Sequence, residues 1–485
     1  MRRLFSKIIL LFALTALQLT ALTGGAHGAV YMANGIKIGE VHQDCAIVWT
    51  RLTTAPERNA DGIPFPEVDG GHNAGADLST ADLTGGHPLD AMEGAAPGAA
   101  GLVQIIYWPA GKPEEKKETS WIPVDPDRDF TRQHLLENLQ PETVYEVRAQ
   151  GKPDVESEVS CIVEGRFKTA PPPDEPATVS LVVVTCGDYP RRDDPDMGHK
   201  IYDAMLRLNP DFFVHTGDIE YYDKPLPWAP NQELARFKWN RIFAMPYQRR
   251  FHCNVTSYFM KDDHDTLRND CRPGQTYGNL TWEQGLAIFR EQTPMREKTY
   301  RTIRWGRDLQ VWLVEGRDFR SPNNMPDGPE KTIWGAEQKA WFKRTVAESD
   351  ATFRVLISPT PVVGPDRDNK ADNHANKAFA YEGNELRQFM ASMKNMIVIN
   401  GDRHWQYVAV DDETGLYEFG TGPSSDAHVG GWPQDDFRPE HRYLNLKGGF
   451  LHVTVTRESG APMMVLRHRS VTGDVYNEVT LPVAQ

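Results

Sequence analysis

Three short apolar runs, each leading within a few residues to a side chain that can bind a metal ion, constrain the fold of this chain most strongly. The runs span residues 181–184, 212–214 and 396–399, and they lead to Cys186, to Asp218 and to the pair Asp402 and His404. Apolar runs of this length are typical of buried β-strands. Because open α/β sheets bind ligands at the carboxyl ends of their strands, we expect the four side chains to converge on one cleft.

Further donors lie close to these strand ends in the sequence. Tyr221 follows Asp218 after two residues, and the polar cluster 262–265 (Asp-Asp-His-Asp) lies between the second and third runs. Hard cations bind anionic oxygen, and a carboxylate that bridges two of them lets them lie close together. We therefore predict Asp218 as a bridging ligand. Tyr221 would bind as a phenolate, which requires a strongly Lewis-acidic ion such as ferric iron.

The length and composition indicate a globular protein of two domains. The chain of 485 residues exceeds what one core usually organises. Hydrophobic residues make up 40% of the chain and include 12 tryptophans, which argues against disorder. The formal net charge of −14 argues against nonspecific binding to nucleic acid or to an anionic membrane, and it favours a protein that carries cations.

The start of the sequence resembles an export signal. Arg2, Arg3 and Lys7 precede an apolar run over residues 8–21, and small residues at 26–28 offer a cleavage site. We predict that residues 1–28 are a signal peptide of the twin-arginine or the Sec type. Since no later run is long enough to span a bilayer, we expect a soluble mature protein in the periplasm or outside the cell. We further expect a monomer that binds nucleic acid only if it is a substrate.

Cysteine usage allows two disulfides in an exported chain. There are five cysteines, so one is left over. If Cys186 is a metal ligand, the pairings that stay within one domain are Cys45 with Cys161 and Cys253 with Cys271. The alternative is that some of these cysteines are buried thiols.

The first third of the chain differs in character from the rest. Residues 29–170 contain short strands and turns, and 139–145 (Leu-Gln-Pro-Glu-Thr-Val-Tyr) resembles the tyrosine corner of fibronectin- and immunoglobulin-like sandwiches. We predict an all-β sandwich domain here. We interpret its aperiodic insertion at 56–101 as a surface loop, with a lid over the cleft as the alternative. A proline-rich linker at 171–177 leads to a catalytic domain over 178–485, in which strands alternate with helices.

Taken together, the motifs are similar to those of the alkaline phosphatase D (PhoD-like) family of metallophosphoesterases. The resemblance rests on Cys186, Gly217-Asp218-x-x-Tyr221, the cluster 262–265, Gly401-Asp402-Arg403-His404, Glu315-Gly-Arg317 and Trp49-Thr-Arg51-Leu52. It implies that the catalytic domain is an α/β protein of the αββα type, a sandwich of two β-sheets flanked by helices. One departure is Glu315, where the family usually has Asp.

The resemblance also implies the metals and their ligands. The family holds a ferric ion with one or two calcium ions beside it, and other divalent ions are compatible with the same donors. The implied iron ligands are Cys186, Asp218, Tyr221 and Asp402. The calcium ions would share Asp218 and bind His404 together with either Asp263 or Asn269, between which the spacing does not choose. Cys186-x-Asp188 occupies the place of the Asp-x-His pair that opens most metallophosphoesterase domains. Asp188 is therefore a further candidate ligand.

Two residues are candidates for roles in catalysis. His264 lies between carboxylates that favour its charged form, as a general acid for the leaving oxygen requires; the alternative is a purely orienting histidine. Arg317 is predicted to clamp phosphate oxygens with its planar guanidinium. The alternative for Arg317 is a salt-bridge network around Asp318 and Glu315.

The sequence thus predicts an enzyme, a metal-dependent hydrolase of phosphate esters in which a metal-bound hydroxide attacks phosphorus in line. The alternative activity is that of a phosphodiesterase acting on lipid, teichoic or nucleic-acid esters. The alternative from a different class is a catalytically dead protein that binds a cell surface through calcium. If a thiolate and a phenolate bind ferric iron, the purified protein should be coloured.

Overall fold

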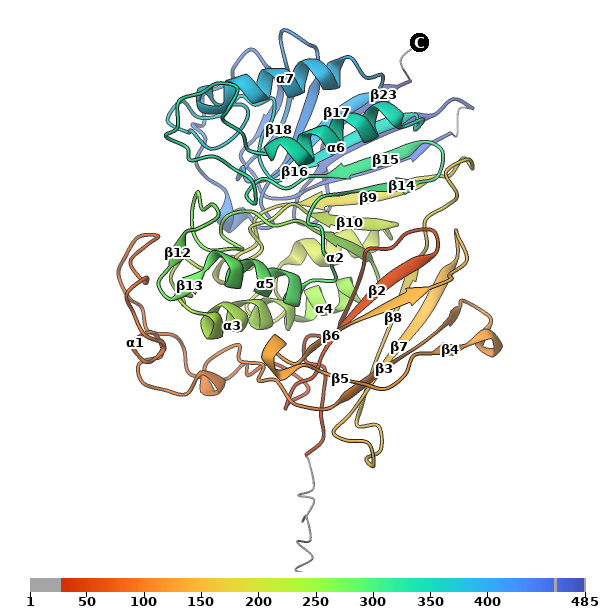
Figure 1. The fold of residues 1–485 in the computed structure, drawn as a ribbon, viewed down its shortest axis with the longest axis vertical. Helices are drawn as coiled ribbons and strands as arrows, with labels where there is room; N and C mark the ends of the chain where they lie inside the picture. The colour runs from red at the N-terminus through yellow and green to blue at the C-terminus, as the bar shows by residue number, and fades with distance from the viewer. Residues whose placement is uncertain (1–27, 458–459, 484–485) are drawn as a thin grey trace, which may run out of the picture.

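Two β-sheets packed face to face form the centre of the molecule, and helices cover both of their outer faces (Figure 1). The computed structural model describes residues 28–457 and 460–483. The predicted signal peptide, residues 1–28, therefore lies outside the described residues except for Gly28. Within the described residues, no helix has the length and apolar character needed to cross a membrane.

The larger sheet joins the N-terminal and the catalytic parts of the chain. Its strands lie in the order β23–β22–β21–β9–β10–β11–β1–β2–β6. Strands β9, β10 and β11 run parallel, so their carboxyl ends lie at the same edge of the sheet. The strands are β1 (Ile36–Gly39), β2 (Cys45–Arg51), β6 (Thr131–Glu137), β9 (Val179–Val184), β10 (Phe212–His215), β11 (Thr256–Phe259), β21 (Phe450–Thr456), β22 (Met463–Arg469) and β23 (Val475–Pro482).

The second sheet packs against the catalytic half of the first. Its order is β14–β15–β16–β17–β19–β18–β20, and β15, β16, β17 and β19 run parallel. The strands are β14 (Arg301–Trp305), β15 (Leu309–Leu313), β16 (Phe353–Ser358), β17 (Met396–Asn400), β18 (Gln406–Val410), β19 (Tyr417–Thr421) and β20 (His441–Asn445).

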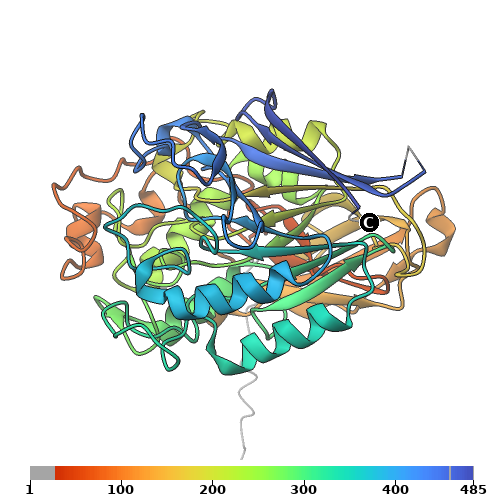
Figure 2. The ribbon, with the colours of Figure 1, turned by 90° about the horizontal axis from the view of Figure 1, so that it is seen from above.

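Helices complete a four-layered arrangement. Figure 2 shows α6 and α7 side by side across the outer face of the second sheet, and Figure 1 shows α2 to α5 on the outer face of the first. The predicted αββα sandwich is therefore confirmed. The helices are α2 (Lys200–Arg207), α3 (Gln232–Phe243), α4 (Pro246–His252), α5 (Trp282–Gln292), α6 (Gly335–Glu348) and α7 (Ala380–Ala391).

The continuous apolar run of β9 follows from its central place in these layers. Leu181 and Val183 point into the core between the two sheets. Val182 and Val184 point the other way, into the core beneath α2 to α5. A strand buried on both faces needs apolar residues at every position rather than at alternate ones. This is why the run could be recognised from the sequence as a buried strand.

The N-terminal region is rich in β-structure, as predicted. A second N-terminal sheet packs on β1, β2 and β6 through a separate apolar core. The hydroxyl of Tyr145 accepts a hydrogen bond from the Gln140 amide at 2.9 Å, which is the expected tyrosine corner. β1 pairs in parallel with β11, so one sheet runs through both parts of the chain. The strands of the second N-terminal sheet are β3 (Leu102–Pro109), β4 (Lys117–Glu118), β5 (Ile122–Pro123), β7 (Val144–Lys152) and β8 (Cys161–Lys168).

The domain boundaries at 170 and 178 remain predictions, since the shared sheet does not mark a division there.

Short helices, strands and 3₁₀ turns lie in the segments that connect the longer elements. They are α1 (Thr80–Thr84), β12 (Thr276–Tyr277), β13 (Leu280–Thr281) and the 3₁₀ turns η1 (Leu89–Ala91), η2 (Pro113–Glu115), η3 (Pro126–Arg128), η4 (Tyr189–Arg191), η5 (Lys377–Phe379) and η6 (Asp426–His428).

The predicted disulfides are wrong. All five cysteines lie in the described part of the chain, and all are free thiols. Cys253 packs in the core of the N-terminal region, whereas Cys271 packs in the core beneath the helices. Cys45 instead accepts a hydrogen bond from Arg296 Nη2 at 3.0 Å. The cysteines are therefore buried or half-buried thiols, which was the alternative.

Candidate metal centre

The carboxyl ends of parallel strands in both sheets bring the predicted ligands to one place. Cys186 lies just beyond β9, Asp218 just beyond β10, and Asp402 just beyond β17 of the second sheet. All three have a left-handed backbone, with φ of 52°, 57° and 63°. This conformation costs a non-glycine residue about 1–2 kcal/mol. The fold holds these residues in strained turns, as is typical of functional sites.

Thiol, phenol, carboxylate and imidazole groups form a continuous series of contacts. Cys186 Sγ lies 3.7 Å from Asp218 Oδ2, and Tyr221 Oη lies 3.4 Å from the same oxygen. Tyr221 Oη also lies 3.4 Å from His404 Nε2. With metal–ligand bonds of about 2.0–2.3 Å, adjacent ligands of one ion are separated by distances of this order.

Carboxylates add two further groups of donors around Asp218. Donor atoms of Asp218, Asp262 and Asp402 lie within 4.8 Å of one another, and so do those of Asp218, Asp263 and His264. Asp218 belongs to both groups, which is the position that a bridging carboxylate needs. Asp262 was not among the predicted ligands, although it stands in the quoted cluster beside Asp263.

The charge of these groups fits a metal ion. Within residues 28–457 and 460–483, neither Asp218 Oδ1 nor Asp262 Oδ2 has a hydrogen-bond partner, although both are buried. Burial raises the pKa of Asp218 well above its usual range, and Asp263 and Asp262 add to the effect. Burial and then Asp218 likewise raise the pKa values of Cys186 and Tyr221. A cation among these groups would favour their anionic forms and so offset the cost of burying them.

Asp265 holds the turn that carries Asp218. Its carboxylate accepts hydrogen bonds from the backbone amides of Asp218 at 2.5 Å and Ile219 at 2.7 Å. Gly217 has a φ of 116°, and a Cβ there would lie 2.6 Å from the backbone nitrogen of Asp262. The Gly-Asp pair is therefore required by the close approach of two strand ends as well as by the chemistry of the site.

His264 lies beside the donors and is held by Asp223, a residue that our sequence analysis missed as a site residue. His264 Nδ1 lies 2.6 Å from Asp223 Oδ1, and Asp223 Oδ2 accepts a hydrogen bond from the Asn269 amide at 2.8 Å. Burial opposes the charged form of His264, but Asp223, Asp263 and Asp218 outweigh it and raise its pKa to about 10. The only hint in the sequence is that Asp223 follows Tyr221 closely.

The insertion reaches this site, so our interpretation of residues 56–101 as a surface loop was incomplete. His72 Nδ1 lies 3.1 Å from Asp223 Oδ2. The ring of His72 also stacks on that of His264, with centroids 5.6 Å apart. Figure 1 shows the insertion running along the side of the molecule that carries α3, β12 and β13. Its aperiodic sequence gives no indication of this contact, because a loop has no register that fixes where it packs.

Two predicted ligands lie at the edge of the donor groups. Asp188 forms an ion pair with Arg191 at 3.4 Å, and it is not a member of the donor groups around Asp218 within the part of the chain that the structure describes. Asn269 lines the cavity beside the donors, but its backbone amide is committed to Asp223. Asp263, by contrast, lies within one of the groups.

Arg317 binds the acidic cluster rather than facing the cavity. Its buried guanidinium contacts Asp262 through Nε and lies 3.4 Å from Asp263 through Nη2. The described residues that line the cavity do not include Arg317. The geometry therefore favours a salt-bridge network over the predicted phosphate clamp.

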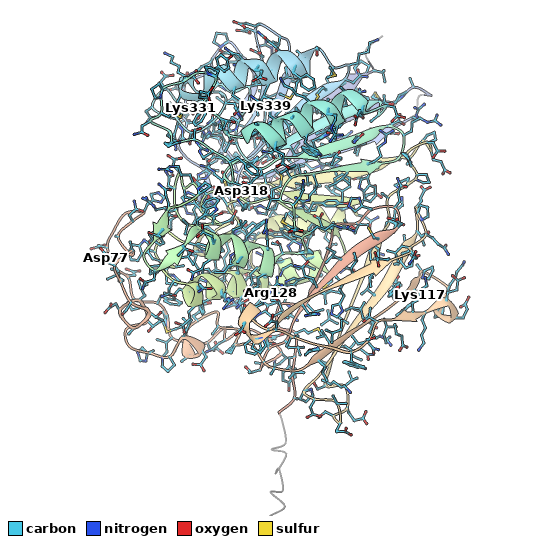
Figure 3. The ribbon with its side chains drawn as sticks, in the orientation of Figure 1. Asp77, Lys117, Arg128, Asp318, Lys331 and Lys339 are labelled. Carbon is cyan, nitrogen blue, oxygen red and sulfur yellow. The ribbon has the colours of Figure 1, made fainter. Side chains whose placement is uncertain are left out.

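The acids that we expected to bind Arg317 bind another cation. Lys261 Nζ lies 2.9 Å from Glu315 and 2.8 Å from Asp318. Figure 3 labels Asp318 near the middle of the view. Glu315, which stands where the family usually has Asp, is therefore paired with Lys261.

A cavity of about 180 Å³ opens beside the donors. Asp218, His264, Asp402 and His404 line it together with His72, Lys224, Asn269, Arg367, Lys370, Trp405 and Gly430. A larger hollow of about 740 Å³ lies elsewhere, against Phe237. Its cations are already paired, Arg51 with Asp129 at 2.8 Å and Arg236 with Glu291 at 2.7 Å. Because members of the donor groups line the smaller cavity, we identify the smaller cavity as the candidate site.

His428 is another residue that the sequence analysis missed. Its Nδ1 donates to the Gly187 carbonyl at 2.9 Å, which leaves the lone pair on Nε2. Its ring lies 4.3 Å from that of His404 and 5.2 Å from that of Tyr221. In the described chain Nε2 has no hydrogen-bond partner. An imidazole fixed by a carbonyl on one nitrogen and free on the other is typical of a metal-binding histidine.

Comparisons with known proteins identify a family and a fold. A family model described as PhoD-like phosphatase matches residues 181–459. A solved structure of PhoD superposes with a TM-score of 0.71 at 16% sequence identity, covering 94% of this chain and 90% of PhoD. The purple acid phosphatase PPD1 from seeds of yellow lupin (Lupinus luteus) superposes with a TM-score of 0.61 at 12% identity, covering 94% of this chain and 74% of that one. No curated protein sequence matches the chain significantly.

Proposed function

The chain belongs to the PhoD-like phosphatase family, and from this premise we propose that it is an exported alkaline phosphatase D-like enzyme that uses ferric iron and calcium. Membership of the family makes it a metal-dependent phosphoester hydrolase. The basic and apolar start of the sequence, residues 1–28, supports export by the twin-arginine or the Sec route.

One observation carries the choice of iron. Cys186, Tyr221 and Asp218 lie in mutual contact at the ends of two neighbouring strands. A thiolate and a phenolate together suit a strongly Lewis-acidic ion such as ferric iron better than calcium, which prefers carboxylate and carbonyl oxygen. His404 was first expected at calcium, but its Nε2 lies 3.4 Å from Tyr221 Oη, so we assign it to the iron.

The carboxylates away from the thiol suit calcium. Asp218 would bridge, and Asp262 and Asp263 would supply further oxygens. Asp402, first expected at the iron, is placed with the calcium ions because it shares a donor group with Asp218 and Asp262. We favour Asp263 over Asn269 because only Asp263 belongs to a donor group. When bound, such ions supply Lewis-acidic charge that activates water and neutralises the phosphoryl oxygens.

His264 is the group best placed to give a proton to the leaving oxygen. Its Nδ1 proton is held by Asp223, so its second proton is on Nε2 in the charged form. Asp223 fixes the ring and balances its charge, and His72 stacks on its face and limits access of water. This supports the general-acid role over a purely orienting one.

Arg317 takes a different role from the one predicted. With both of its acidic neighbours, Asp262 and Asp263, bound to its guanidinium, it holds their carboxylates toward Asp218. We therefore propose that Arg317 is a positioning residue. The cations that face the substrate are those that line the cavity.

A hydrolysis assay with two substrates tests this function. The purified protein is expected to release nitrophenol from nitrophenyl phosphate, and elemental analysis is expected to find iron and calcium in it. Faster turnover of bis(nitrophenyl) phosphate would make the enzyme a phosphodiesterase instead. Failure to hydrolyse either ester by a metal-loaded protein would favour the calcium-dependent binding protein.

A further inference from the structure

We propose that Lys224 binds a non-bridging oxygen of the phosphate that is hydrolysed, the role first predicted for Arg317. This inference rests on the proposed function, because it names a substrate contact in the same cavity. Lys224 follows the segment that supplies Asp218 and Tyr221, so one stretch of chain would contribute ligands for the metal and a cation for the substrate.

Most of these cations already have an acidic partner. Arg367 lies 3.6 Å from Asp366, and Lys370 lies 3.4 Å from Asp372. Arg317 is bound by the acidic cluster itself. Because such pairs neutralise one another, these cations have little need of a further anion.

Lys224 is the exception in the cavity wall. Across residues 28–457 and 460–483, no carboxylate oxygen lies within ion-pair distance of its Nζ. Nζ instead lies over the ring of Tyr221, 3.5 Å from the centroid. A half-buried ammonium that lacks a counter-ion is unfavourable unless an anion binds there.

The position of Lys224 identifies that anion. It lines the same cavity as Asp218, His264 and His404, and it contacts the ring of the predicted iron ligand Tyr221. A group bound there would lie between the ammonium and the ions that the metal ligands would hold. An oxyanion is the ligand that both sides attract, and charge-assisted hydrogen bonds of this kind are among the strong ones. In a phosphoester hydrolase this oxyanion is the phosphoryl group of the substrate or of the product.

The test compares Lys224→Met with Lys224→Arg and with Lys117→Met as a control. Figure 3 shows Lys117 at the far edge of the molecule, on β4. For Lys224→Met we expect the inhibition constant of inorganic phosphate and the KM for nitrophenyl phosphate to rise about tenfold to a hundredfold, with unchanged iron and calcium content. Lys224→Arg should recover part of the loss, and Lys117→Met should behave as wild type.

Two results would overturn the proposal. One is an unchanged inhibition constant and KM in Lys224→Met. The other is loss of the metals from that variant, which would mean that Lys224 acts by supporting Tyr221. Binding of inorganic phosphate is also measured by titration calorimetry, which needs no turnover. If wild type hydrolyses no ester, the proposed function fails, while the calorimetric comparison still decides the role of Lys224.

Discussion

Replacing Asp218 with asparagine is expected to lower kcat/KM for phosphate esters by more than about a thousandfold. Loss of a residue that merely orients a metal ligand typically costs about 10- to 100-fold. Asp218 belongs to both donor groups and contacts Cys186 and Tyr221, so its loss affects every ion at once. Asparagine keeps the shape of the side chain but removes the charge. We therefore expect the purified variant to have lost iron and calcium together, as measured by elemental analysis.

The matched control is Asp77→Asn. Asp77 is exposed in the insertion, at the edge of the molecule in Figure 3. This variant should keep wild-type activity and metal content. Because the Asp218 turn is also fixed by Asp265, circular dichroism and thermal unfolding should show that Asp218→Asn is folded. A folded Asp218→Asn protein that retains activity would remove Asp218 from the ligands.

Replacing His264 with glutamine is expected to produce a loss that depends on the leaving group. General acids contribute about 10²–10⁴-fold. With an alkyl phosphate, whose alkoxide leaves poorly without a proton, kcat should fall by about that factor. With nitrophenyl phosphate, whose phenolate leaves readily, the fall should be much smaller. Rates measured over a series of leaving groups should therefore depend more steeply on leaving-group pKa in the variant than in wild type.

The leaving-group series separates two roles of His264. His87→Gln, an exposed histidine of the same insertion as His72, is the matched control and should leave the series unchanged. An equal loss for every leaving group in His264→Gln would contradict the general-acid role. It would instead favour a histidine that only orients its neighbours Asp223 and Asp263.

The strand ends could be predicted from the sequence because each is encoded locally. Residues 181–184 of β9 and 212–214 of β10 alternate between the two cores, so both strands contain unbroken apolar runs. Parallel neighbours then bring their carboxyl ends to one edge. Cys186 and Asp218 could be placed near one another by this argument alone, before any contact was known.

Other contacts join segments that are far apart in the chain, and no local sequence pattern predicts them. His72 approaches His264 from an insertion about two hundred residues earlier, and nothing in its polar, glycine-rich surroundings marks it. His428 lies beyond β19 in a similarly aperiodic segment. The irregular backbone of such loops takes its path from tertiary packing, which neither composition nor periodicity encodes.

The partners of charged residues were predicted least well. The guanidinium of Arg317 was expected to pair with Glu315 or Asp318, its neighbours in the sequence, or to clamp a phosphate. It pairs with Asp262 and Asp263 rather than with Glu315 or Asp318, and the phosphate clamp stays an untested prediction. The cysteine pairings failed for a related reason. Counting cysteines within a domain does not show that Cys253 and Cys271 belong to different apolar cores.

The central claim is that side chains from the strand ends of both sheets hold the metals at which phosphate esters are hydrolysed. Diffraction data collected on either side of the iron absorption edge, from crystals of the active enzyme, test it most directly. We expect an iron peak in contact with Cys186 Sγ, Tyr221 Oη and Asp218, with calcium among the carboxylates of Asp262, Asp263 and Asp402. An active enzyme whose crystals hold no metal among these residues would contradict the account.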